Sequence, residues 1–226
     1  MPLPDKDEGN KFAKAHDLAY DALRHWIFNG PLKPGELIRD VEVAKLLGIS
    51  RTPVREAIIR LAHEGLIDTS KGRKTRVTIP DLQRAPDLYR VGSVLDGLAV
   101  ELAMPKIADA DVRRMHALNA EMDKEVDADR LVRLDLEFHA VFRRLAGEVL
   151  QELLNGIETE IARLERLAFD DAEIRALTRR DHHAIADAVA AGNAAAAAEE
   201  VRRNWVSAWE RLEARLNADR KTALEA

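Results

Sequence analysis

The first third of the chain shows hydrophobic residues at helical spacing behind a polar tail. The tail, residues 1–11, contains two prolines, and we expect it to be disordered. Leu18, Leu23, Trp26 and Ile27 recur with the period of one helix face. With the capping and breaking residues around them, such patterns predict helices over about residues 12–29 and 41–47, and a third helix that follows a cap at Ser50 or Thr52 and ends at Gly65.

The residues between these segments are of the types that begin and end helices. Asp40 can cap the second helix, and Gly48 follows it where the chain must turn sharply into the third. Ser50 or Thr52 can cap the third helix, and Pro53 suits its first turn because its missing N–H has no helical partner there. This order predicts a helix-turn-helix unit.

After the third helix, the pattern changes to short runs of strand-forming residues. Residues 66–69 and 75–79 are predicted as two strands, joined by an exposed basic turn over residues 70–74. Pro80 then breaks the chain. We therefore expect a winged helix-turn-helix domain over residues 12–80.

From residue 81 onward the pattern is helical. In the first of these helices, Leu88, Val91, Leu95, Leu98 and Leu102 are expected to face inward. The predicted fold class is mainly α, with an N-terminal winged helix-turn-helix and a C-terminal all-helical bundle over residues 81–226. The helices of this bundle are expected over residues 81–104, 109–127, 129–145, 148–169, 172–191 and 194–216.

Composition narrows the class of protein. The chain contains no Cys, which excludes disulfides, thiolate metal sites and cysteine nucleophiles. It has no apolar run long enough to span a bilayer and no signal peptide, so we expect a soluble, cytoplasmic protein without a membrane partner. Residues 1–80 hold 14 Lys and Arg against 11 Asp and Glu, whereas residues 81–226 hold 21 against 29. A basic module on an acidic body suits a nucleic-acid binder, although such an asymmetry also arises by chance.

The start of the third helix carries the candidate DNA-binding side chains. Arg51 and Arg55 lie one turn apart, opposite the apolar stripe of that helix. An arginine fork can bind guanine or phosphate, and a helix N-terminus attracts phosphate. The alternative is a small helical domain with a solvated basic face, which fits isolated arginines better than this ordered set. The full candidate set is Ser50, Arg51, Thr52 and Arg55, with Lys71, Gly72 and Arg73 in the turn of the wing.

This part of the chain resembles a known family. The segment LRHWIFNGPLKPGELIRDVEVAKLLGISRTPVREAIIRLAHEGLI is similar to the winged helix-turn-helix of GntR-type bacterial transcription regulators, and SRTPVREA is among the most specific signatures of that family. The helical remainder resembles the FadR branch, whose effector part is the all-helical FCD domain. The resemblance implies a homodimer on a short palindrome of double-stranded operator DNA, with small organic acids or related metabolites as the usual effectors. It also implies DNA contacts at Arg51, Thr52, Arg55, Lys71 and Gly72.

A set of polar residues lies on apolar faces of the predicted bundle. Asp135 and His139 are four residues apart and share a helix face with bulky apolar residues, while His182 and Asn204 face inward on two later helices. Buried polar groups need partners, and these oxygen and imidazole donors suit a divalent Zn, Ni or Mn ion. The residues alone favour the alternative, a satisfied Asp–His pair in the core. His183 replaces His182 if the helix register is shifted by one.

The family resemblance favours the metal site. Many FCD domains carry an Asp, a His four residues later, a second His in a segment like DHHAIADA, and a third His 22 residues further on. Asp135, His139 and His182 match the first three positions. The fourth position is Asn204, and a neutral amide oxygen is a weaker ligand than imidazole.

A second departure concerns the effector. The family often has an Arg that meets the effector carboxylate at the position of Gly92 in this chain. Arg90 lies two positions earlier, about 200° around a helix, and so does not replace it directly. Either the effector is not a simple carboxylate, or another basic residue binds it. Arg143, one turn after His139, is the other candidate effector-binding residue, although a surface position is the simpler interpretation.

The sequence therefore predicts a ligand-responsive transcription regulator, more often a repressor in this family. One alternative is a DNA-binding regulator that has lost effector sensing, given Asn204 and Gly92. The other is a metallohydrolase built on Asp135, His139 and His182, because zinc hydrolases also use three protein ligands. The DNA-binding module would then be unexplained, so we expect the chain not to be an enzyme.

Overall fold

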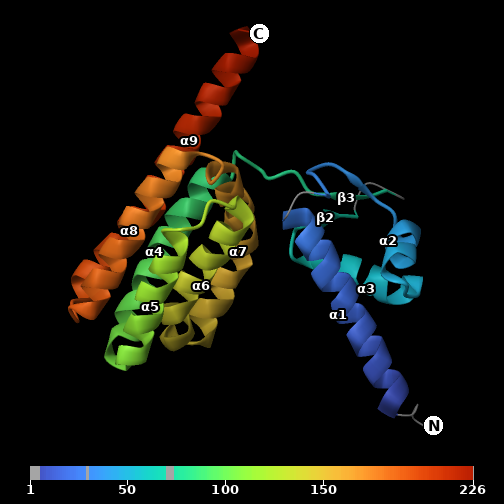
Figure 1. Cartoon of the computed structure of the whole chain (residues 1–226), viewed down its shortest axis with the longest axis horizontal. Helices are drawn as coiled ribbons and strands as arrows, with labels where there is room; N and C mark the ends of the chain where they lie inside the picture. The colour runs from blue at the N-terminus through green and yellow to red at the C-terminus, as the bar shows by residue number, and fades with distance from the viewer. Residues whose placement is uncertain (1–5, 29–30, 70–73, 226) are drawn as a thin grey trace. The chain divides into compact units, whose positions relative to one another are not determined.

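The computed structural model describes residues 6–28, 31–69 and 74–225. The chain divides into two compact units, Met1–Pro80 and Asp81–Ala226. Most of the described residues are helical, and the small sheet lies in the first unit, which confirms the predicted mainly α fold (Figure 1).

The first unit contains a three-stranded sheet in place of the expected two-stranded wing. A short strand, β1, joins the two predicted strands, and the antiparallel order is β1-β3-β2. β1 has two residues, too few to show the alternation by which a strand is recognised in a sequence. The elements of this unit are α1 (Lys6–Phe28), β1 (Leu37–Ile38), α2 (Asp40–Leu47), α3 (Arg51–His63), β2 (Ile67–Asp68) and β3 (Thr75–Val77).

Helix α1 begins earlier than the sequence predicts. It starts at Lys6, whereas the sequence predicted a start near residue 12; residues 1–5 lie outside the described residues, and the disorder of the tail stays a prediction. A helix that has already formed gains one backbone hydrogen bond for each residue added, and this favours extension into a polar segment.

The core of the first unit joins α1 to the helix-turn-helix. Ala19, Leu23 and Ile27 are buried on one face of α1, whereas Leu18, which was expected to face inward, is 47% exposed. The tight turn between α2 and α3 depends on Gly48, whose φ of 67° is left-handed and whose N–H donates to the carbonyls of the last turn of α2. The buried stripe of α3 is Val54, Ala57, Ile58 and Leu61.

The second unit is an all-helical bundle (Figure 1). Helix α4 packs against α6, α7 and α9, and α8 packs against α5 and α9. Among the described residues, no helix has both the length and the apolar composition needed to cross a membrane. The helices are α4 (Ala85–Ala103), α5 (Asp109–Met122), α6 (Ala128–Ala146), α7 (Glu148–Ala168), α8 (Ala172–Ala190) and α9 (Ala194–Glu225), with a short 3-10 turn at Met104–Lys106.

The inward face of α4 differs from the predicted one. Leu88 is buried as expected, but Val91, Leu98 and Leu102 are 49%, 40% and 46% exposed. The face that packs inside is made of small and polar residues, among them Gly92, Ser93, Asp96 and Gly97. Large side chains from α9 fill the space that these small residues leave, because a Cβ at Gly92 would overlap Trp205 and one at Gly97 would overlap Arg202.

The contact between Gly92 and Trp205 predicts that alanine lowers the free energy of unfolding at position 92 but not at a glycine with open space around it. Gly92→Ala forces the Trp205 ring to move in a packed core, and we expect a loss of about 1–3 kcal/mol in the free energy of unfolding. Gly156→Ala in α7 is the matched control, because nothing lies within 4 Å of the added Cβ there, and it should be neutral or stabilising by up to ~1 kcal/mol. Urea unfolding of both variants measures the difference, and equal effects would contradict this packing.

Candidate functional site

The N-terminal turn of α3 presents polar side chains to solvent. Arg51, Thr52 and Arg55 are exposed on one side, while Pro53 and Val54 are buried on the other. Ser50 precedes the helix in an extended conformation, is exposed, and makes no side-chain capping bond. The free backbone N–H groups of the helix start and two arginine side chains are therefore exposed near the same end of α3.

Asp40 binds both of these arginines. Its Oδ2 lies 2.6 Å from Nε of Arg55 and 3.0 Å from Nη2 of Arg51. Burial raises the pKa of Asp40, but the hydrogen bonds from Arg55 and Arg51 outweigh it and hold that pKa below its usual value. The sequence predicted that Asp40 caps α2, but Asp40 is the first residue of that helix. Arg39 occupies the capping position, without a side-chain capping bond.

A groove connects α2, α3 and the base of the wing. Arg39, Asp40, Arg51 and Arg55 line it from the helices, and Lys74 lines it from the wing. The predicted wing contacts Lys71, Gly72 and Arg73 lie outside the described residues.

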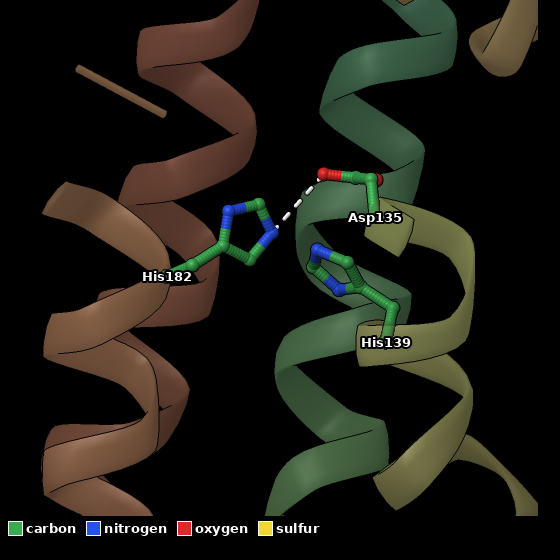
Figure 2. Close-up of side chains that lie close together, drawn as sticks. All are labelled: Asp135, His139 and His182. Carbon is green, nitrogen blue, oxygen red and sulfur yellow. Dashed lines mark ion pairs between the residues drawn. The ribbon is translucent and has the colours of Figure 1, made fainter. Parts of the chain in front are cut away.

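A second group of polar side chains converges inside the helical bundle. Asp135 and His139 come from α6 and His182 comes from α8, and all three are buried. One ligand atom from each lies within 4.8 Å of the others. Figure 2 shows His182 and Asp135 pointing toward one another with His139 beside them. His182 Nε2 is 3.0 Å from Asp135 Oδ1, without the geometry of a hydrogen bond.

In both histidines, Nδ1 has a partner that fixes the orientation of the imidazole ring. Nδ1 of His139 lies 2.7 Å from Oδ2 of Asp96, and Nδ1 of His182 lies 3.0 Å from the carbonyl oxygen of Thr178. Because a carbonyl can only accept, Nδ1 of His182 donates. Nε2 is then the atom of that ring left for a metal. Metal-binding histidines in proteins have such partners, a carboxylate or a backbone carbonyl on the other nitrogen.

Two further side chains with oxygen donors line the cavity that contains Asp135 and His139. Asn204 is buried on α9, and its Oδ1 has no hydrogen-bond partner among the described residues. Glu165 on α7, which the sequence analysis did not identify, has a shielded Oε2 that is also unpartnered within the described chain. Burial and the charge of Asp135 raise the pKa of Glu165 well above its usual value. The free volume is about 10 Å³, which is room for one ion or water molecule.

Asp135 is the acidic member of the cluster that stays ionised. Burial raises the pKa of Asp135, but His182, His139 and Arg143 outweigh burial and lower it. One carboxylate, two oriented imidazoles and unpartnered oxygens form a donor set that fits a divalent cation.

Comparisons with known families account for both units. The FCD domain matches residues 87–206, and the bacterial regulatory proteins of the gntR family match residues 16–77. This chain belongs to the GntR family. Its first unit is the helix-turn-helix domain of that family, and its second unit is an FCD domain.

Characterised relatives support this assignment. The chain is 32% identical to the Nta operon transcriptional regulator of Aminobacter aminovorans over 66% of this chain and 71% of that protein. It is 29% identical to the transcriptional regulator LutR of Bacillus subtilis over 76% and 89% of the two chains. These relatives are regulators, which confirms the prediction that this GntR-family chain is a DNA-binding transcription regulator and not an enzyme.

Solved structures share the fold. McbR/YncC of E. coli superposes with a TM-score of 0.74 at 21% identity, covering 91% of this chain and 98% of that one. A GntR-type regulator from Rhodococcus sp. RHA1 gives a TM-score of 0.77 at 24% identity, covering 89% and 98%.

Asp96 is another residue of the FCD domain that the sequence analysis missed. It is fully buried and accepts hydrogen bonds from Nε and Nη2 of Arg143 at 2.6 and 2.9 Å and from Nε1 of Trp205 at 3.0 Å, in addition to contacting His139. Burial raises the pKa of Asp96, but Arg143 and His139 hold it far below its usual value. A single acid inside the apolar run VGSVLDGLAV was the available signal.

The two arginines proposed for the effector lie in different environments. Arg143 is buried and its Nε and Nη2 are both bonded to Asp96, so the interpretation of Arg143 as a surface residue is wrong. Its partner is 47 residues away in the sequence, which the local pattern cannot reveal. Arg90 is exposed beside Asp87 and does not line the cavity at Asp135.

The register of α8 places one histidine inside and its neighbour outside. His182 is fully buried, whereas the His183 side chain is 44% exposed and contacts the carboxylate of Asp123 at 3.1 Å.

Proposed function

We propose that this GntR-family protein represses transcription as a homodimer on a short palindromic operator, and that a divalent metal ion and a small organic acid in its FCD domain change that binding. The convergence of Asp135, His139 and His182 carries the sensory part of the proposal. The ligand shifts operator affinity only if it binds the DNA-bound and free arrangements with different affinity.

The start of α3 supplies the DNA contacts of this proposal. An α-helix fits the major groove, and the side chains of its first turn reach base edges. Asp40 orients the guanidinium groups of Arg51 and Arg55 side by side, so less side-chain freedom is lost when they meet bases and phosphates.

Removal of one of these arginines tests the DNA-binding face. We expect Arg55→Ala to weaken binding to the operator by about 1–3 kcal/mol, because one bidentate contact is lost. Arg113→Ala is the control, since Arg113 is exposed on α5 in the FCD domain. Fluorescence anisotropy over a range of salt concentrations, on an operator selected from genomic fragments, measures both variants. Equal effects of the two substitutions, or binding insensitive to salt, would contradict this role.

An exposed apolar stripe on α4 supports the homodimer. Val91, Val94, Leu98 and Leu102 lie along this helix with exposed fractions between 40% and 63%. Apolar stripes of this kind mark protein interfaces, and a palindromic site needs a symmetric pair of DNA-binding domains. A second copy of the chain is the partner that meets both requirements.

A charge placed in this stripe tests the dimer. We expect Leu98→Glu to convert a dimer into a monomer, because the interface would bury two carboxylates without partners. Val126→Glu is the control, since Val126 is 71% exposed and precedes α6. Light scattering after size-exclusion chromatography gives the mass of each variant. A wild-type monomer, or a Leu98→Glu dimer as stable as the control, would refute the interface.

The buried cluster supports the metal part of the proposal. Asp135, His139 and His182 would hold the ion, and Asn204 Oδ1 offers a further oxygen at the position where the family has a histidine. When bound, the ion would act as a Lewis acid that anchors the carboxylate of an effector. Asp96 and the Thr178 carbonyl hold the two imidazole rings in the required orientation.

Single histidine substitutions test the metal site. His139→Ala should abolish binding of Zn, Ni and Mn, while His183→Ala, next to His182 but outside the cluster, should bind as the wild type does. In the wild type, an ion at 100 times its dissociation constant should stabilise the fold by about 2.7 kcal/mol. Calorimetric titration and thermal unfolding measure both quantities. A wild-type protein that binds none of the three metals would favour a regulator that has lost its sensor.

A further inference from the structure

Two arginines of the FCD domain, Arg143 and Arg211, have side chains that are 8% and 11% exposed, and they differ in which guanidinium nitrogens are bonded. Arg143 uses Nε and Nη2 together to hold both oxygens of Asp96. Arg211 on α9 uses the opposite nitrogen, Nη1, which lies 2.8 Å from Oδ2 of the buried Asp181. Nε and Nη2 of Arg211 are shielded from solvent and have no hydrogen-bond partner within the described chain.

The unpartnered atoms of Arg211 form one recognition surface. Nε and Nη2 lie on the same edge of the guanidinium plane, and this edge binds a carboxylate with two parallel hydrogen bonds. A buried N–H without a partner costs about 1–3 kcal/mol, so an edge with two such atoms strongly favours a ligand that accepts from both. The Arg143–Asp96 pair shows the same edge with its carboxylate in place.

This edge lies next to the proposed metal ligands. Arg211 lines a cavity together with Asp135, Glu165 and Asn204, and these last three also line the cavity at His139. A ligand on Arg211 would therefore be a neighbour of the cluster from which the metal would be held.

Arg211 also borders a larger groove on the outside of the domain. The groove has a volume of about 490 Å³, and Arg211 and Ile174 line both it and the inner cavity. The inner cavity leaves only about 10 Å³. The inner space holds about one water-sized group, so the ligand that fits places only its carboxylate at the edge of Arg211 and its body in the groove.

We propose that Nε and Nη2 of Arg211 bind the carboxylate of the organic-acid effector, the role for which Gly92 provides no side chain and for which Arg143 is already occupied. This inference rests on the proposed function, because it assumes a sensory FCD domain. Asp181 acts as a positioning residue that fixes the guanidinium through Nη1.

Lysine substitution tests this role. Arg211→Lys retains the charge beside Asp181 but loses the two-pronged edge. The full-length protein, loaded with metal, is titrated with acetate, succinate and benzoate, with the neutral amides acetamide, succinamide and benzamide as uncharged probes. We expect the wild type to bind at least one of the acids and none of the amides, and Arg211→Lys to bind that acid at least about tenfold more weakly.

Arg203→Lys is the matched control on the same helix. Arg203 is exposed beside Glu200 and lines neither the outer groove nor the inner cavity. We expect this control to bind the same acid within about twofold of the wild type, as surface charges contribute little. The proposal is overturned if no acid binds the wild type, if the amides bind equally well, or if Arg211→Lys binds as the control does.

If Arg211→Lys does not fold, a crystal structure of the wild-type protein with the best-binding acid tests the proposal instead. The proposal requires the carboxylate on Nε and Nη2 of Arg211, and a carboxylate bound only in the outer groove or elsewhere would overturn it. Operator binding by the wild type without acid is measured separately. Its absence would refute the proposed function, whereas operator binding without acid binding would refute only the role of Arg211.

Discussion

The buried carboxylate of Asp96 is the interaction on which the FCD domain depends. A buried charge is tolerated only when it is paired and its oxygens accept hydrogen bonds, and Asp96 meets this condition with donors from α6 and α9. One side chain of α4 thereby fixes the rotation of two other helices. The small residues around it on α4 follow from the same constraint, because α9 must come close enough for Trp205 to reach the carboxylate.

Asp96 also connects the packing of the domain to its candidate chemistry. The oxygen that accepts from Trp205 also contacts Nδ1 of His139, so the orientation of that imidazole depends on the position of α9. A carboxylate behind a histidine raises its basicity and selects the nitrogen available to an ion. In the helix-turn-helix domain, Asp40 orients two exposed arginines in a comparable way. Its position is accessible, and DNA can compete with it for the guanidinium groups.

The hydrophobic periodicity of the sequence was enough to predict features that depend only on local helix geometry. It placed Arg51 and Arg55 on the outer face of α3 and His182 on the inner face of α8, because a helix repeats every 3.6 residues. It was insufficient for α4, where apolar residues occur on both faces and two of those expected inside, Val91 and Leu98, lie outside. Arg143 and Arg211 were beyond its reach, since their acidic partners come from distant positions and only the fold brings them together.

Helix α9 is continuous from Ala194 to Glu225. Asn204, Trp205 and Arg211 lie within two turns of it and contact the interior of the domain through separate neighbours. Because the helix is unbroken, a shift of its backbone at any one of these residues moves the other two with it. The segment beyond Arg211 extends for about 21 Å at the helical rise of 1.5 Å per residue. A small tilt of α9 around these three residues would therefore produce a larger displacement at the carboxyl end of the helix.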